Sequence, residues 1–182
     1  AADLVWDRNS GTVTHRVGGR VADGVDDTAI TAVLSKWSAI AYVKARAAAD
    51  PVTLAVPTGS QTYSVGQQFE FTMTGATKPF LTLFNLPPDG RVESFMPETA
   101  KDVETDWRDR KFSVELKVAK PPYGAEHMVA ILTDRPATAL QEALRSMSTA
   151  DRAGGLAATL RSTLADTPFQ AGVVSIYTAG GE

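Results

Sequence analysis

The middle of the chain carries its clearest pattern of apolar and polar positions. Every second residue from Phe69 to Met73 is apolar, which is the period of a strand with one solvated face. Residues 80–86 are almost continuously apolar, as in a strand buried on both faces. Pro87-Pro88-Asp89-Gly90 is typical of a tight turn, because proline presets φ and glycine tolerates a positive φ. We therefore expect residues 63–96 to form a meander of three consecutive strands.

Helical periodicity is strongest between residues 28 and 48. The apolar residues there recur every three or four positions and form one stripe: Ile30, Val33, Leu34, Trp37, Ile40 and Ala41. Acidic residues precede the segment and basic residues end it, which suits both ends of a helix dipole. The pattern predicts one long helix, with Trp37 either anchored against a sheet or stacking on a ligand.

Shorter patterns predict the remaining elements. Alternating runs indicate strands at residues 4–6, 12–17, 20–22, 52–56, 111–118, 127–132 and 173–177. Two C-terminal helices are expected after Pro136, with inner faces marked by Leu140, Leu144 and Met147 and by Leu156, Leu160 and Leu164. Residues 97–111 show no period, so we expect a charged loop there.

These elements predict an α+β fold: a mainly antiparallel β-sandwich, Ig-like or related, with a long N-terminal helix and two C-terminal helices packed on it. We expect residues 1–50 to form a hairpin and helix that pack on the main domain. Residues 51–182 would then form the sandwich domain with its C-terminal helices. A chain of 182 residues with 43% hydrophobic residues is long enough to bury such a core.

Composition excludes several classes of function. The net charge of −3 is spread over interspersed acids and bases, so we expect no nucleic-acid partner. No apolar run approaches the roughly 20 residues of a membrane span. The absence of cysteine removes disulfides, thiolate metal sites and a cysteine nucleophile. The start at Ala1 suggests a fragment of a longer protein.

Candidate chemistry is sparse, and we predict no catalytic residue, metal or cofactor. His127 shares a predicted strand face with Val129 and Ile131, which favours a core histidine over a catalytic base. Four acids in residues 97–111 present oxygen ligands of the kind that calcium prefers: Asp102, Glu104, Asp106 and Asp109. Neighbouring lysines and arginines neutralise them, which favours a solvated loop over a calcium site.

Trp107 stands out as a large aromatic residue inside that charged segment. It either folds back onto the sandwich or anchors an interface with a partner. Phe95, Met96 and Tyr123 would lie near it if the loops gather at one end of the sandwich. We take these four residues as the candidate binding surface.

Six motifs resemble a bacterial domain of unknown function that is found C-terminal to caspase-like peptidase domains. They are Tyr63-x-Val65-Gly66, Phe69-x-Phe71, the run Phe80 to Leu86, Asp89-Gly90-x-Val92, Phe95-x-Pro97 and Pro121-Pro122-Tyr123-Gly124. The opening residues around Trp6 and the pair Lys36-Trp37 also look like the segment that joins such a peptidase to this domain.

The resemblance implies a non-catalytic accessory or interaction module of a larger caspase-like protein. It would bind or position a protein partner, an adjacent peptidase domain or a ligand, and it favours a periplasmic or secreted location over a cytoplasmic one. No site residue of the family is carried over. Two alternatives stay open: an extracytoplasmic sandwich that binds glycan or envelope, which would need a row of exposed aromatics, and a hydrolase.

Overall fold

The computed structural model describes residues 4–17, 19–57, 61–118, 122–149 and 155–180. Its strands are β1 (Leu4–Asp7), β2 (Thr12–His15), β3 (Arg20–Ala22), β4 (Thr53–Ala55), β5 (Thr62–Ser64), β6 (Gln68–Thr74), β7 (Phe80–Leu86), β8 (Glu93–Met96), β9 (Phe112–Lys117), β10 (Gly124–Thr133) and β11 (Phe169–Ala179). Its helices are α1 (Ile30–Ala47), α2 (Ala100–Glu104), α3 (Thr138–Thr149) and α4 (Leu156–Thr163). The predicted long helix and both C-terminal helices are thus confirmed.

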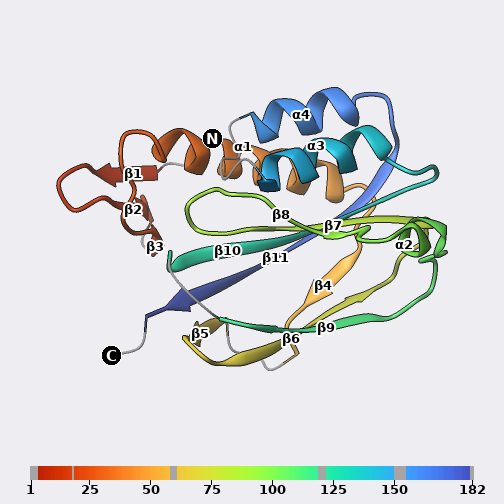
Figure 1. Ribbon diagram of the computed structural model, residues 1–182, viewed down its shortest axis with the longest axis horizontal. Helices are drawn as coiled ribbons and strands as arrows, with labels where there is room; N and C mark the ends of the chain where they lie inside the picture. Colours follow the sequence, from red (N-terminus) through yellow and green to blue (C-terminus); the bar gives the residue numbers. More distant parts are fainter. Residues whose placement is uncertain (1–3, 18, 58–60, 119–121, 150–154, 181–182) are drawn as a thin grey trace.

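The elements form three layers (Figure 1). A mixed eight-stranded sheet lies in the middle, helices α1, α3 and α4 cover one of its faces, and an antiparallel sheet of β4, β6 and β9 faces the other. The architecture is therefore α+β, with two sheets that do not close into a barrel. In the described part of the chain, no helix combines the length and apolar character required to cross a membrane.

Strand β10 is the centre of the eight-stranded sheet. It pairs antiparallel with β11 along its whole length and with β7 on its other side, and β8 continues the sheet beyond β7. At its first residue β10 also pairs with β3, which brings in the hairpin of β1 and β2. Strand β5 pairs parallel with β11. This pair makes the sheet mixed, whereas the other paired strands of the sheet are antiparallel, as the prediction of a mainly antiparallel arrangement has it.

The predicted three-strand meander is wrong. Strand β6 lies between β4 and β9 in the smaller sheet, whereas β7 and β8 belong to the larger one. The chain leaves β6 at Gly75, whose φ of 80° is in the left-handed region. The buried Gln170 holds this crossing, because its amide nitrogen donates to Gly75 O and its amide oxygen accepts from Thr77 N. Only the β7–β8 hairpin of the expected meander is confirmed.

Alternation along β10 separates two hydrophobic cores. Val129 and Ile131 face the helices, in a core that includes Ile40 of α1 and Leu144 of α3. The residues that alternate with them along β10, among them Met128, face the smaller sheet, so both faces of the strand are buried. We call these the helix-side core and the strand-side core.

Candidate functional site

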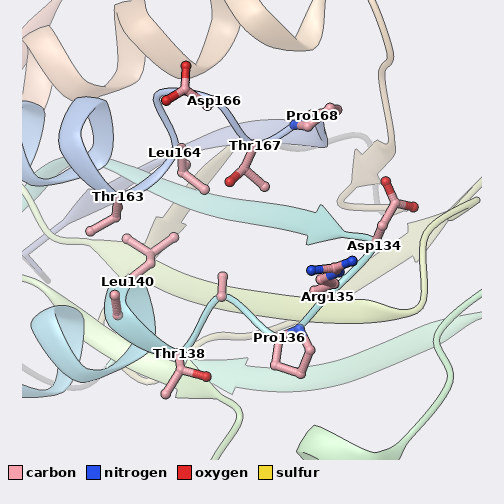
Figure 2. A pocket seen from close by; sticks show the side chains of 12 residues that line it. Asp134, Arg135, Pro136, Thr138, Leu140, Thr163, Leu164, Asp166, Thr167 and Pro168 are labelled. Carbon is pink, nitrogen blue, oxygen red and sulfur yellow. The ribbon is translucent and has the colours of Figure 1, made fainter.

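A groove of about 480 Å³ opens where two connections meet at the end of the sheet (Figure 2). One connection runs from β10 into α3 and the other from α4 into β11. The groove is lined by Asp134, Arg135, Pro136, Ala137, Thr138, Ala139, Leu140, Thr163, Leu164, Asp166, Thr167 and Pro168. Figure 2 shows Asp134 and Arg135 on one wall and Asp166 to Pro168 on the other.

Local contacts set the walls of the groove. The Thr133 hydroxyl donates to Arg135 O at 2.6 Å and turns the chain away from β10. Pro136 then lies just before α3, where a missing N–H costs nothing. On the other wall the Thr167 N–H donates to Leu164 O at 3.3 Å and closes the end of α4. Both walls are therefore fixed by hydrogen bonds to the backbone.

Charges of both signs surround the groove. Lys78 Nζ lies 2.6 Å from a carboxylate oxygen of Asp134, and the lysine side chain is only 15% exposed. Lys78 also lines a neighbouring depression of about 250 Å³, together with Arg46 and Asp50, and the two hollows share Thr167 and Pro168. The surface can therefore accept a polar or zwitterionic segment. Its lining residues include three threonines and two aspartates but no histidine, serine or cysteine.

The structure brings together three of the four predicted binding residues. Trp107 is 9% exposed and packs edge-on against Phe112, with ring centroids 5.6 Å apart. Phe95 and Met96 are half-buried and pack on the same strand-side core. Of the two alternatives for Trp107, its burial favours folding back onto the sandwich. None of these residues lines the groove.

Tyr123 lies apart from that cluster. It is half-buried and packs against a separate cluster that contains Tyr63, Phe69, Val118 and Ile176. The motif Pro121 to Gly124 falls partly outside the described residues, which resume at Pro122. The predicted gathering of all four aromatic and methionine side chains at one end is thus not what the structure shows.

Two of the acidic residues of segment 97–111, Asp102 and Asp106, are engaged within the chain. Asp102 accepts hydrogen bonds from the Thr99 N–H and hydroxyl, which caps α2 and lowers the pKa of its carboxyl. The Arg108 side chain donates to Asp106 and lowers the pKa of that carboxyl to about 2. Helix α2 was missed, although Thr99-x-x-Asp102 is a capping pattern. In the described ranges no three histidine or carboxylate side chains gather as metal ligands.

A fully buried lysine lies beneath α1. Lys36 Nζ donates to Pro87 O at 2.8 Å and to Ala125 O at 2.5 Å, and its exposed fraction is 0%. Burial lowers its pKa from 10.5 to about 7, against the opposing effect of the carboxylates of Glu126 and Asp89. Sequence reasoning missed this residue as a site, although it falls on the buried stripe of α1.

His127 also lies under α1, on the predicted face with Val129 and Ile131. It is 2% exposed, and the Trp37 ring meets it edge-on with centroids 5.0 Å apart. Burial, reinforced by the charges of Lys36 and Lys44, lowers the pKa of His127 to about 2. The imidazole is therefore neutral at physiological pH and inaccessible to a substrate, which favours the core interpretation.

Polar side chains also interrupt the strand-side face. Asn85 Nδ2 donates to Glu93 Oε2 at 3.0 Å and to Glu126 Oε2 at 3.2 Å. Burial raises the pKa of Glu126, and the hydrogen bond from Asn85 opposes this shift. The adjoining cavity has a volume of about 20 Å³ and is lined mainly by apolar residues. A space of this size holds about one water molecule, so it is too small for an organic ligand.

Comparison with protein-family models gives no match to this chain, and a search of curated proteins likewise returns no match.

Proposed function

We propose that this chain is a non-catalytic accessory module of a larger bacterial caspase-like protein. In this proposal the groove between the β10–α3 and α4–β11 connections takes a segment of an adjacent peptidase domain or another protein partner. The observation that carries the proposal is the combination of an open groove of about 480 Å³ with a lining that lacks histidine, serine and cysteine. Such a surface suits binding more than catalysis.

The rest of the chain supports a scaffold role. The two histidines of the chain, His15 in β2 and His127 in β10, both pack against the Trp37 ring, with ring centroids 6.1 Å and 5.0 Å from it, and neither lines the groove. The facing of the two sheets across the strand-side core supports the finer proposal of a sandwich related to Ig-like domains. The glycan-binding alternative gains no support, because Trp107 and Tyr63 are 9% and 5% exposed and Tyr123 is half-buried.

The complete reading frame gives the first test. The proposal requires an upstream domain with a histidine and cysteine dyad, and a frame without one would refute the caspase-like context. The peptidase region, purified separately, is then titrated with this chain by isothermal calorimetry. Asp166→Arg reverses one exposed charge on a groove wall, and we expect it to weaken binding by about tenfold, equivalent to about 1.4 kcal/mol.

Lys111→Glu is the matched control for this titration. Lys111 is exposed beside β9, in the other sheet, and it does not line the groove. It should leave the affinity unchanged. Equal affinities for Asp166→Arg and the unmodified chain would show that the groove is not the binding site. The absence of any binding would show that the peptidase region is not the partner.

A further inference from the structure

We propose that Lys36 is a protonation-controlled latch that joins α1 to the β7–β8 turn and to the start of β10. The amine reaches all three elements at one point, since it stands on α1 and donates to Pro87 O in the turn and to Ala125 O in β10. These contacts bridge 51 and 89 positions of sequence. One side chain therefore connects three segments that are far apart in the sequence.

The number of acceptors matches the neutral amine. A neutral lysine amine has two N–H groups and an ammonium has three. Lys36 Nζ has two hydrogen bonds to described residues, and both are to carbonyl oxygens. Protonation would add a charge and a third donor inside a site with 0% exposure, where an unpaired donor and a charge are both costly.

The charged groups around the amine do not compensate by contact. Asp89 faces it from the β7–β8 turn, and that carboxylate already accepts a hydrogen bond from Arg91. Glu126 acts on the amine from β10, but its side chain lies on the strand-side face of the sheet, where its carboxylate accepts a hydrogen bond from Asn85. His127, also on β10, remains neutral, and Lys44 lies further along α1. The two carboxylates therefore stabilise the charged form of Lys36 only through electrostatic attraction, without accepting a hydrogen bond from its amine.

The turn has little freedom to move without α1. Gly90 ends the turn with a φ of 83°, and a Cβ at this position would lie 2.4 Å from the carbonyl carbon of Ala32. The backbone of the turn therefore rests directly on the backbone of α1. When the amine is protonated, the unpaired donor and its charge lie where α1, the β7–β8 turn and β10 meet, and we expect α1 and the β7–β8 hairpin to loosen together.

The test is the dependence of thermal stability on pH. The folded pKa of Lys36 is about 7 and the ordinary lysine pKa is 10.5, so between these values the unfolded chain binds more protons and stability rises with pH. We expect Tm to rise by about 5–10 °C between pH 7 and pH 9. The Lys36→Met variant should lose most of this rise, whereas Lys44→Met, on the exposed face of the same helix, should keep it. Identical slopes for the unmodified chain and Lys36→Met would refute the latch.

A second measurement covers the case in which Lys36→Met does not fold. The ¹³Cε resonance of Lys36 in the unmodified protein is followed by NMR from pH 5 to pH 11, with Lys44 as the internal reference. A midpoint near 7 and lower amide-exchange protection factors in α1 and β7–β8 below that midpoint support the latch. A midpoint near the ordinary lysine value, or exchange in these segments that is independent of Lys36 protonation, overturns it.

Discussion

Gly90 of the β7–β8 turn lies against Ala32 of α1 with no room for a side chain between them. A Cβ built at Gly90 would be 2.4 Å from both the carbonyl carbon and the carbonyl oxygen of Ala32. The helix layer and the central sheet are therefore in contact here through backbone atoms. A side chain at this position would have to push the turn away from the helix.

This contact predicts a large cost for Gly90→Ala. The variant combines a positive φ with overpacking against backbone, and we expect it to lower the free energy of unfolding by about 3 kcal/mol. Gly75→Ala is the matched control, because Gly75 has a similar φ of 80° and open space around its Cβ position. It should cost only about 1 kcal/mol. Equal losses in urea unfolding would show that φ alone accounts for the effect.

Trp107→Ala should act on stability. The ring fills the strand-side core beside Phe112, so we expect the free energy of unfolding to fall by about 3 kcal/mol. Trp107→Phe should cost less, since the indole N–H has no hydrogen-bond partner among the described residues. Chemical denaturation monitored by far-UV circular dichroism measures both. An unchanged midpoint for Trp107→Ala would instead return this residue to the role of an exposed interface anchor.

Gln170→Leu should be more damaging than a comparable change at Gln141. The buried Gln170 amide makes hydrogen bonds to Thr77 N, Gly75 O and Pro51 O, and the substitution leaves these backbone groups unpaired. We expect a loss of about 3 kcal/mol. Gln141 is also buried, but its amide donates to a single hydroxyl, that of Thr82, so Gln141→Leu should cost about 1 kcal/mol. Thermal melts of the two variants provide the comparison, and a reversed order would contradict this account of the crossing between sheets.

His127 predicts a loss of stability in acid. Its folded pKa of about 2 lies below the value of 6.5 expected on unfolding, so its contribution is complete above pH 6.5 and falls as the pH drops toward 2. The slope is about 1.4 kcal/mol per pH unit. His127→Leu should flatten the stability profile between pH 6 and pH 4, whereas His15→Gln should not. The raised pKa of Glu126 makes the opposite contribution, because it stabilises the fold as the pH falls. This contribution is the same in the unmodified protein and in both variants, so it cancels in the comparison.

Strand positions could be predicted because each depends on local alternation. The partners of each strand could not, because β6 and β7 follow one another within a few residues and still enter different sheets. The crossing between them is held by hydrogen bonds from Gln170, a residue more than 90 positions away along the chain. The parallel pairing of β5 with β11 is equally invisible to a local pattern.

The candidate site was predicted less well than the fold. Trp107 was noted for its size, and burial in the core explains why an aromatic residue stands in a charged segment. The groove is built from two connections without periodicity, so no pattern in the sequence marks it. Lys36 did leave a signal: it continues the spacing of Val33, Ile40 and Val43, all of them buried. A charged residue in register with an apolar stripe indicates a buried polar contact.

The place of β11 has a consequence for how the molecule assembles during synthesis. It is the last element in chain order, yet it lies between β10 and β5 and contributes Phe169 and Ala171 to the helix-side core. While the ribosome is still making residues 169–179, one long edge of β10 remains open and β5 has no partner strand. A nascent chain stalled before this point would expose a sheet edge with unpaired backbone N–H and C=O groups, which is the kind of surface that chaperones bind.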